Sequence, residues 1–275
     1  MRGAAFGILG AALLLATLAA AEPPRRVVSA NLCTDQLAML IAAPGQLVSV
    51  SHVARDPVSS AMAAEAEGFA VNHGTAEEIF LLAPDLVLAG EYLRPDARLT
   101  LERLGLRVET FPIDASLKDV RANIARMGAL LGREARAAEL VEALDAALVP
   151  PPPGPRPTAA LFYANAYTSG AGTLADEILR QAGLDNLAAR QGVSGLARLP
   201  LELLALEAPD LLVIGQDYAT PALAQAVLRH PVARALGSAR TTVADNLWVC
   251  GLPQTAQAVT ALRAWAEGRA EAPQR

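Results

Sequence analysis

The chain has 275 residues, of which 53% are hydrophobic, 19% are charged and 4% are aromatic, and its formal net charge is −5. This composition is far from that of a disordered chain, and the acidic balance argues against a surface that binds nucleic-acid phosphates. The length is sufficient for one large domain or for two lobes that each bury a core.

The first 21 residues predict a signal peptide. Arg2 is followed by an almost wholly small or apolar stretch, and Ala19-Ala20-Ala21 offers the small residues that a signal peptidase accepts. A retained membrane anchor is the alternative, but the stretch is only marginally long enough to cross a bilayer and no stop-transfer charges follow it. No cysteine stands at the cleavage point. We therefore expect cleavage near Ala21 and a soluble, unlipidated protein in the periplasm.

Strand and helix patterns alternate through residues 22–115, which predicts an N-terminal α/β lobe with a parallel sheet. Residues 26–30 form the first expected strand, and Thr34 or Asp35 is expected to cap the helix that follows. Residues 47–50 and 108–111 are further expected strands.

Residues 75–90 are echoed by residues 200–215. Each segment predicts a short amphipathic helix, a Pro-Asp break at Pro84 or Pro209, and an apolar strand that ends in glycine. Apolar runs without alternation are typical of strands buried on both faces. This repeat indicates two similar α/β lobes.

The strongest helical pattern lies between the two repeats. Apolar residues recur at three- and four-residue spacing from Leu117 to Leu148, which predicts a single interlobe helix over residues 116–149. Such a helix would extend roughly 50 Å, or less if it bends near Gly132. A proline-rich boundary at residues 150–157 ends it. Residues 158–275 then predict a C-terminal α/β lobe with a first strand at 158–163, a last strand at 247–250 and a terminal helix over about 255–267.

The chain resembles a known family in several segments that occur in the family's order. These segments are Arg26–Ser29, Glu77 with Pro84–Val87, the interlobe helix, Tyr167–Gly170, and Glu202 with Pro209–Leu212. The family is that of the helical-backbone (class III) periplasmic binding proteins, which serve ABC importers of cobalamin, ferric siderophores and haem. The resemblance implies two Rossmann-like lobes with parallel sheets, one long interlobe helix, and a ligand cleft that closes only modestly.

The same resemblance implies a monomeric solute-binding protein without cofactor or catalytic residues. Its expected partners are a small-molecule metal chelate and the membrane subunits of an ABC importer. No nucleophile elbow, zinc-protease motif or Walker loop occurs in the sequence. A bare metal-ion binder and a sensor without a transport role remain the rival functions.

Glu77 and Glu202 occupy equivalent places in the two repeats, each in the first turn of its expected helix. Acidic residues at this position also complement the helix dipole, and Thr75 with Glu78 forms a capping-box pattern. In proteins of the resembling family, one carboxylate on each lobe pairs with arginines of the importer. The resemblance therefore assigns Glu77 and Glu202 to importer docking.

Ligands of α/β sheets bind at the carboxyl ends of the strands. The residues that follow expected strands are therefore the candidates for the cleft. They are Asn31, Cys33, His52, Arg55, His73, Tyr92 and Arg94 in the first lobe and Tyr163, Tyr167, Tyr218, Cys250 and Gln254 in the second. Each of them is also compatible with a surface or packed position.

The two cysteines, Cys33 and Cys250, fall on different lobes of the expected fold. We expect two free, partly buried thiols. A disulfide that ties the lobes and a thiolate contact to a soft metal are the alternatives.

The ligand type is less well defined by the sequence. Aromatic residues near strand ends suit a flat macrocycle or catecholate. Where cobalamin binders often place a tryptophan, this chain has Asn72-His73-Gly74, which offers an imidazole for a metal centre such as cobalt or haem iron. We rank a corrinoid such as cobalamin first, a ferric siderophore second and haem third, and we expect no resident metal site.

Overall fold

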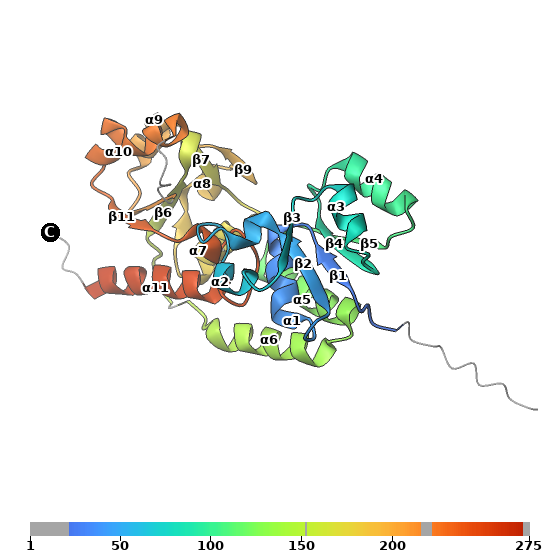
Figure 1. Cartoon of the computed structure of the whole chain (residues 1–275). Coiled ribbons are helices and arrows are strands. Elements are labelled where there is room, and N and C mark those ends of the chain that lie inside the picture. The colour runs from blue at the N-terminus through green and yellow to red at the C-terminus, as the bar shows by residue number, and fades with distance from the viewer. Residues whose placement is uncertain (1–21, 152, 216–221, 272–275) are drawn as a thin grey trace, which may run out of the picture.

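A computed structural model describes residues 22–151, 153–215 and 222–271 of the chain. Two α/β lobes lie side by side, and the terminal helix runs along the base of the second lobe (Figure 1). The expected signal peptide, residues 1–21, lies outside the described residues. None of the helices in the described part is long and apolar enough to cross a bilayer.

The N-terminal lobe is built on a five-stranded sheet in the order β3-β2-β1-β4-β5, and every neighbouring pair in it is parallel. Its strands are β1 (Val27–Ser29), β2 (Leu47–Ser51), β3 (Ala70–Asn72), β4 (Leu86–Gly90) and β5 (Val108–Phe111). Its helices are α1 (Leu32–Ile41), the 3-10 turn η1 (His52–Arg55), α2 (Ala63–Ala66), α3 (Ala76–Leu81), α4 (Pro95–Arg103), α5 (Leu117–Leu131) and α6 (Glu134–Ala147). The parallel sheet confirms the expected α/β class of this lobe.

The C-terminal lobe has a parallel four-stranded sheet in the order β11-β10-β6-β8 and a separate antiparallel pair, β7 and β9. The strands are β6 (Thr158–Phe162), β7 (Tyr167–Ser169), β8 (Asp185–Asn186), β9 (Leu196–Arg198), β10 (Leu211–Ile214) and β11 (Ala239–Thr242). The helices are η2 (Ala164–Ala166), α7 (Leu174–Gln181), α8 (Leu187–Arg190), α9 (Leu201–Glu207), η3 (Leu223–Arg229), α10 (Pro231–Ala235), η4 (Asp245–Leu247) and α11 (Thr255–Glu271).

The sequence repeat forms the expected unit in each lobe, α3 with β4 and α9 with β10. In the first lobe, the Asp85 carboxylate accepts the backbone N–H groups of Arg25 and Arg26, at 2.7 and 3.0 Å, just before β1. In the second lobe, Asp210 accepts the N–H of Thr158 at the start of β6, at 2.7 Å. Each Pro-Asp break therefore both ends a helix and aligns the first strand of its lobe.

The single interlobe helix expected over residues 116–149 is wrong, because two antiparallel helices occupy this range. Gly132 adopts a left-handed conformation (φ 65°), which ends α5 and turns the chain back on itself. Arg121 on α5 then pairs with Asp145 near the end of α6 at 2.6 Å. A Cβ atom at Gly128 would collide with Ala137, so the small residues allow the two helices to approach closely. The apolar pattern beyond Gly132 is thus the packed face of a second helix.

One buried apolar cluster runs through both lobes. It extends from Leu37 and Leu88 in the first lobe, through Ile124 on α5, to Leu161 and Val213 in the second. The backbone passes from one lobe to the other between α6 and β6. Because the core is continuous, the two lobes are held together by packing as well as by this connection.

The strand expected at residues 247–250 is also wrong, because this segment forms η4 and a turn that contacts the N-terminal lobe. Asn246 donates to the carbonyl oxygen of Pro57 at 3.1 Å, and the N–H of Gly251 donates to Asp114 at 3.2 Å. The residues on either side of this segment therefore bond to the N-terminal lobe, and the segment does not add a strand beside the edge strand β11.

Candidate functional site

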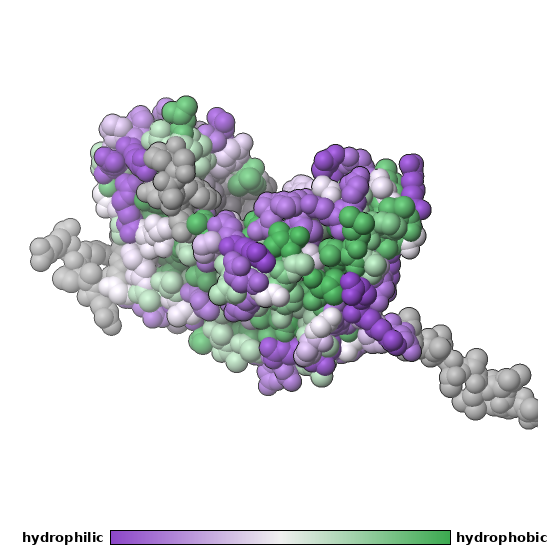
Figure 2. Space-filling view, in the orientation of Figure 1, coloured by the Kyte–Doolittle hydropathy of each residue, from purple (hydrophilic) through white to green (hydrophobic). Residues whose placement is uncertain are grey.

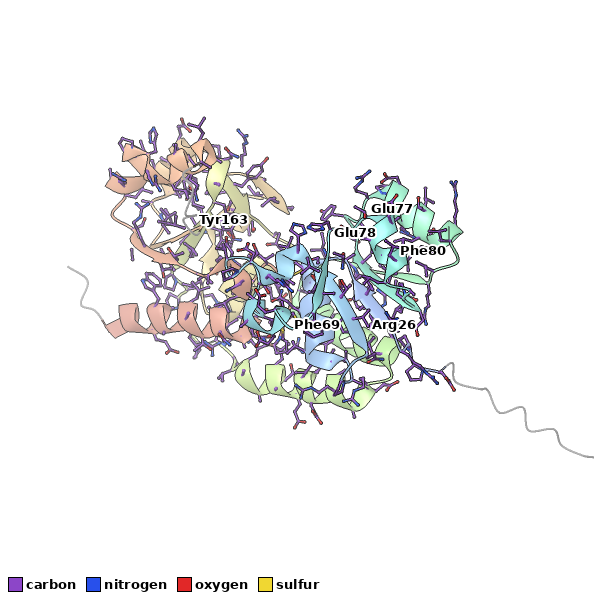
Figure 3. The ribbon with its side chains drawn as sticks, viewed as in Figure 1. Arg26, Phe69, Glu77, Glu78, Phe80 and Tyr163 are labelled. Carbon is purple, nitrogen blue, oxygen red and sulfur yellow. A yellow bond between two sulfur atoms is a disulfide. The ribbon has the colours of Figure 1, made fainter. Side chains whose placement is uncertain are left out.

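The lobes enclose a notch, which the space-filling view shows opening at the upper side of the molecule (Figure 2). In the stick view, Arg26 and Phe69, which precede β1 and β3, lie at the opposite side of the N-terminal lobe (Figure 3). Glu77 and Glu78, which follow β3, lie beside the notch (Figure 3). The carboxyl ends of this parallel sheet therefore face the notch, where α/β sheets bind their ligands. We call the notch the cleft.

Two histidines emerge from adjacent strand ends of the N-terminal lobe. His52 follows β2, His73 follows β3, and their rings stack with centroids 5.0 Å apart and an interplanar angle of 26°. Both side chains are exposed. The pairing of β2 with β3 brings these two predicted cleft residues together.

Glu78 holds the second histidine. Its carboxylate accepts the backbone N–H of His73 at 2.7 Å and lies 3.0 Å from the ring atom Nδ1. The backbone bond from His73 is the largest cause that lowers the pKa of Glu78 below its ordinary value. Because a carboxylate only accepts hydrogen bonds, Nδ1 carries the hydrogen in this contact, and in the neutral imidazole Nε2 is then the nitrogen with the free lone pair. The arrangement presents an oriented imidazole nitrogen.

The capping box expected for Thr75 and Glu78 is half formed. The hydroxyl of Thr75 accepts the N–H of Glu78 at 3.3 Å, as expected for an N-cap. The carboxylate of Glu78, however, bonds to His73, two residues before the cap. The sequence pattern therefore did not predict the bond between Glu78 and His73.

A buried polar network lies beneath the histidines. The side-chain amide of Asn72, just before His73, donates to the Ser29 carbonyl at 2.8 Å and to the Ser49 hydroxyl at 2.9 Å. The hydroxyl of Ser51, just before His52, donates to Asp35 at 2.5 Å. These bonds fix the two strand ends from which the imidazoles emerge.

Asp35 is fully buried in the first turn of α1. Burial raises its pKa to about 6, and hydrogen bonds such as that from Ser51 oppose the shift only in part. Its Oδ1 atom has no hydrogen-bond partner among the described residues. The sequence suggested Asp35 only as a helix cap. The residue that caps α1 is Asn31, whose side chain accepts the N–H groups of Cys33 and Thr34.

The second lobe contributes an aromatic wall. Tyr163, directly after β6, meets Trp248 edge to face at a centroid distance of 6.4 Å. A cavity of about 310 Å³ is lined by these two rings together with Ser169 and Asp245. Burial raises the pKa of Tyr163 above its ordinary value, so its hydroxyl stays protonated. This cavity offers apolar ring faces with a small number of polar groups, which is typical of a small-molecule site.

Tyr167 lies apart from this cavity, at the start of β7 in the antiparallel pair β7–β9. The guanidinium of Arg198 on β9 stands 5.6 Å from its ring centroid. Tyr167 and Arg198 are thus an exposed aromatic and cationic pair on the antiparallel strands of the second lobe.

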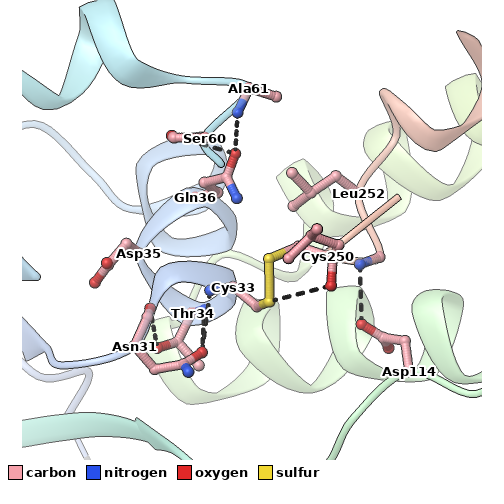
Figure 4. Close-up of a disulfide and its surroundings, with 12 residues drawn as sticks. Asn31, Cys33, Thr34, Asp35, Gln36, Ser60, Ala61, Asp114, Cys250 and Leu252 are labelled. Atoms are coloured by element: carbon pink, nitrogen blue, oxygen red, sulfur yellow. Dashed lines mark hydrogen bonds between the residues drawn. A yellow bond between two sulfur atoms is a disulfide. The ribbon is translucent and has the colours of Figure 1, made fainter. Parts of the chain in front are cut away.

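The two cysteines form a disulfide, so the expectation of free thiols is wrong (Figure 4). Cys33 lies in the first turn of α1 and Cys250 in the turn after η4, with Cα atoms 5.1 Å apart. This distance is within the reach of a disulfide. The bridge can form because the turn at residues 247–250 brings Cys250 against the N-terminal lobe. A thiolate contact to a ligand is thereby ruled out for the bridged protein.

The remaining predicted residues are spread more widely. Arg55 bonds to the backbone of the loop before β3, including the Phe69 carbonyl at 2.7 Å, which is a local structural role. Tyr92 is 82% exposed after β4, and Arg94 pairs with Asp96. Gln254 is half-buried just before α11, and Tyr218 lies outside the described residues.

Glu77 and Glu202 are exposed in the first turns of α3 and α9. Figure 1 shows these two helices at the tops of their lobes, on opposite sides of the cleft. Among the described residues, no group of three or more His, Cys, Asp or Glu side chains is arranged to hold a bare metal ion.

Comparison with known proteins agrees with this architecture. The model of the periplasmic binding protein family matches residues 27–242. A cobalamin-binding protein of Halobacterium salinarum is 28% identical over 199 residues, which cover 70% of this chain and 54% of that protein. The chain thus spans about half the length of the curated relatives it matches.

Two solved structures show the same fold. The apo periplasmic haem-binding protein RhuT from Roseiflexus sp. RS-1 matches with a TM-score of 0.73 and 19% identity, covering 90% of this chain and 99% of that one. The periplasmic vitamin B12-binding protein BtuF of Vibrio cholerae matches with a TM-score of 0.64 and 19% identity, covering 91% and 99%. With two α/β lobes, a cleft at the strand ends and this match over most of its length, the chain belongs to the periplasmic binding protein family.

Proposed function

We propose that the protein is exported with cleavage near Ala21, captures a flat metal chelate in its cleft and delivers it to an ABC importer. A corrinoid such as cobalamin is the first choice of ligand. The protein would bind the chelate and release it to the importer, and we assign it no chemical step.

The observation that carries the ligand proposal is the contact between His73 and Glu78. An imidazole that donates the N–H of one ring nitrogen to a carboxylate is fixed in tautomer and orientation. Its other ring nitrogen becomes a better metal ligand. The ring of His52 beside it limits the rotation of His73. The pair suits a metal whose other coordination positions are already filled by a macrocycle, because such a metal needs one ligand from the protein.

Aromatic side chains support a flat ligand. Tyr163 and Trp248 line the cavity of the second lobe, and Tyr167 is exposed on the antiparallel pair β7–β9. Rings of this kind stack on or pack against a conjugated macrocycle. The likeness to the cobalamin-binding protein of Halobacterium salinarum supports a corrinoid.

Haem is the second candidate, and the same His73 nitrogen favours it. Haem iron takes a histidine as axial ligand, with second-shell bonds as the protein's means of tuning it. A ferric siderophore has its iron enclosed by its own oxygens and would leave His73 without a metal to bind.

A panel of ligands tests these assignments. Thermal unfolding is measured with aquocobalamin and diaquacobinamide, whose axial water an imidazole can replace, and with hemin, ferric siderophores and Zn²⁺, each in excess. A ligand at a hundred times its Kd adds about 2.7 kcal/mol of stability, which gives a clear rise in Tm. We expect such a rise with a corrinoid. A rise with hemin instead would select the second candidate, a rise with Zn²⁺ alone would select a bare-ion binder, and no rise at all would contradict the metal-chelate proposal.

His73→Gln and Glu78→Gln test the imidazole. Loss of a second-shell carboxylate typically weakens metal binding by about 10–100-fold, and His73→Gln should weaken it at least as much. His230→Asn is the matched control, because His230 caps α10 and accepts the N–H of Val232. Unchanged affinity and an unchanged visible spectrum in His73→Gln would remove this residue from the site.

Importer docking is proposed for Glu77 and Glu202. One carboxylate on each lobe, on both sides of the cleft, suits a partner with twofold symmetry and basic side chains, and would steer the encounter. The double charge reversal Glu77→Arg with Glu202→Arg should abolish delivery and leave ligand affinity intact. Loss of ligand binding instead would show that these residues belong to the cleft.

A further inference from the structure

Each of the two repeated helices carries an exposed leucine at the same place. Leu81 on α3 is 82% exposed, and Leu206 on α9 is 80% exposed. Single exposed apolar residues are ordinary on protein surfaces. Two of them at equivalent positions in two lobes, with nearly equal exposure, require a common explanation.

The leucines share a helix face with the glutamates already assigned to docking. Leu81 follows Glu77 by four residues, and Leu206 follows Glu202 by four residues. Residues at this spacing lie one above the other on the same face of a helix. Side chains of a helix also lean toward its N-terminus, so each leucine leans back along the helix toward its glutamate.

The two helix ends also have the same backbone geometry. The residue two places beyond each leucine is an alanine in the left-handed region, Ala83 with φ 46° and Ala208 with φ 41°. This conformation is uncommon for alanine and is unfavourable relative to glycine. The two leucines therefore precede the same uncommon backbone conformation in the two lobes.

We propose that Leu81 and Leu206 are a pair of apolar contacts with the membrane subunits of the importer, each seated in a socket beside the basic group that receives the neighbouring glutamate. This proposal rests on the docking function proposed above. An exposed apolar side chain next to a carboxylate matches the composition of interfaces, where an apolar centre is surrounded by polar groups. The carboxylates steer the approach, and the leucines slow dissociation.

The positions of the two leucines favour the importer's membrane subunits over other partners. A contact formed once on each lobe, on both sides of the cleft, needs a partner that offers two equivalent surfaces, and a pair of membrane subunits does so. The glutamates on the same helices, Glu77 and Glu202, disfavour an anionic lipid surface or a second copy of this acidic chain.

The test is the double variant Leu81→Ser with Leu206→Ser. Binding of the ligand-free protein to its importer in lipid nanodiscs is measured by surface plasmon resonance, with empty nanodiscs as a parallel arm. Each leucine should contribute about tenfold to affinity, and the pair about a hundredfold, mainly through faster dissociation. The ligand found in the thermal panel should bind as tightly as before, and far-UV circular dichroism should be unchanged.

Leu99→Ser with Leu223→Ser is the control, because it removes one exposed leucine from each lobe outside the repeated helices, with exposures of 51% and 95%. The proposal is overturned if the Leu81/Leu206 variant and this control bind the importer equally well. It is also overturned if the Leu81/Leu206 variant loses as much binding to empty nanodiscs as to nanodiscs that carry the importer. The glutamate reversal separates the two ideas. If it abolishes docking while the leucine variant docks normally, only the leucine proposal fails. If the reversal docks normally, the proposed docking function fails.

Discussion

Replacing Asp35 by asparagine is expected to stabilise the protein at neutral pH and to destabilise it slightly at pH 4. The carboxyl is fully buried, and its pKa is raised from 3.8 to about 6. A raised carboxyl pKa means that the folded state binds the proton more tightly than the unfolded state. The stability due to this group is therefore complete below pH 3.8, falls as the pH rises, and is lost above about pH 6.

The size of the effect follows from the same shift. A shift of one pKa unit corresponds to about 1.4 kcal/mol, so charging Asp35 lowers the free energy of unfolding by about 3 kcal/mol at pH 8. Asparagine keeps an acceptor for the Ser51 hydroxyl but places an amide where Oδ1 has no partner among the described residues. The unpaired amide offsets about 1 kcal/mol or more of the stability that is gained by removing the buried charge. We therefore expect a net gain of about 1–2 kcal/mol at pH 8.

Urea unfolding of the wild type and Asp35→Asn at pH values from 4 to 8 measures this gain. The informative quantity is the difference between the two proteins at each pH, because the other titrating groups then cancel. It should grow with pH and level off above about pH 7. Glu142→Gln, on the exposed face of α6, is the control and should shift stability by less than about 0.5 kcal/mol. A difference that does not vary with pH would refute the buried charge as its cause.

Three further predictions concern the junction between the lobes. The double variant Cys33→Ala with Cys250→Ala removes a bridge across 217 residues and should lower the free energy of unfolding by about 2–5 kcal/mol in urea; an unchanged midpoint would exclude a contribution of the bridge. A specific protease site inserted after Gly154, in the exposed crossing between the lobes, should yield two fragments that separate on a gel only after reduction; separation without reductant would contradict the disulfide. Gly251→Ala should destabilise the protein by about 1–3 kcal/mol, because a Cβ atom there would collide with Val120 and Asp114, whereas Gly237→Ala has open space and should be tolerated.

The sequence predicted the repeated units correctly because their signals are local. Pro84 and Pro209 end helices by their own chemistry, and the apolar runs after them have the composition of buried strands. The repeat itself indicated two lobes, and the family resemblance added the order of the segments and the cleft between the lobes.

The helical hairpin was missed because an apolar repeat looks the same in one long helix and in two helices that fold back. The difference depends on Gly132, which turns the chain, and on the close contact of Gly128 with Ala137. That contact depends on how α5 and α6 pack in three dimensions, which the apolar pattern does not specify.

The candidate site was predicted in part. The rule that ligands bind at strand ends found His52, His73 and Tyr163, which the structure places at strand ends of their lobes. Glu78 was read as a capping residue because its spacing from Thr75 fits that pattern, and its bond to His73 depends on where the β3–α3 turn directs the ring. The Cys33–Cys250 pairing depends on a turn where the pattern predicted a strand.

The bridge between Cys33 and Cys250 also imposes an order on the maturation of the chain. Its second sulfur belongs to Cys250, so the chain through residue 250 must reach an oxidising compartment before the ring can close. A product truncated before residue 250 would therefore keep a free thiol at Cys33, available to the thiol–disulfide exchange enzymes of that compartment. In this way the disulfide distinguishes a completed chain from an interrupted one.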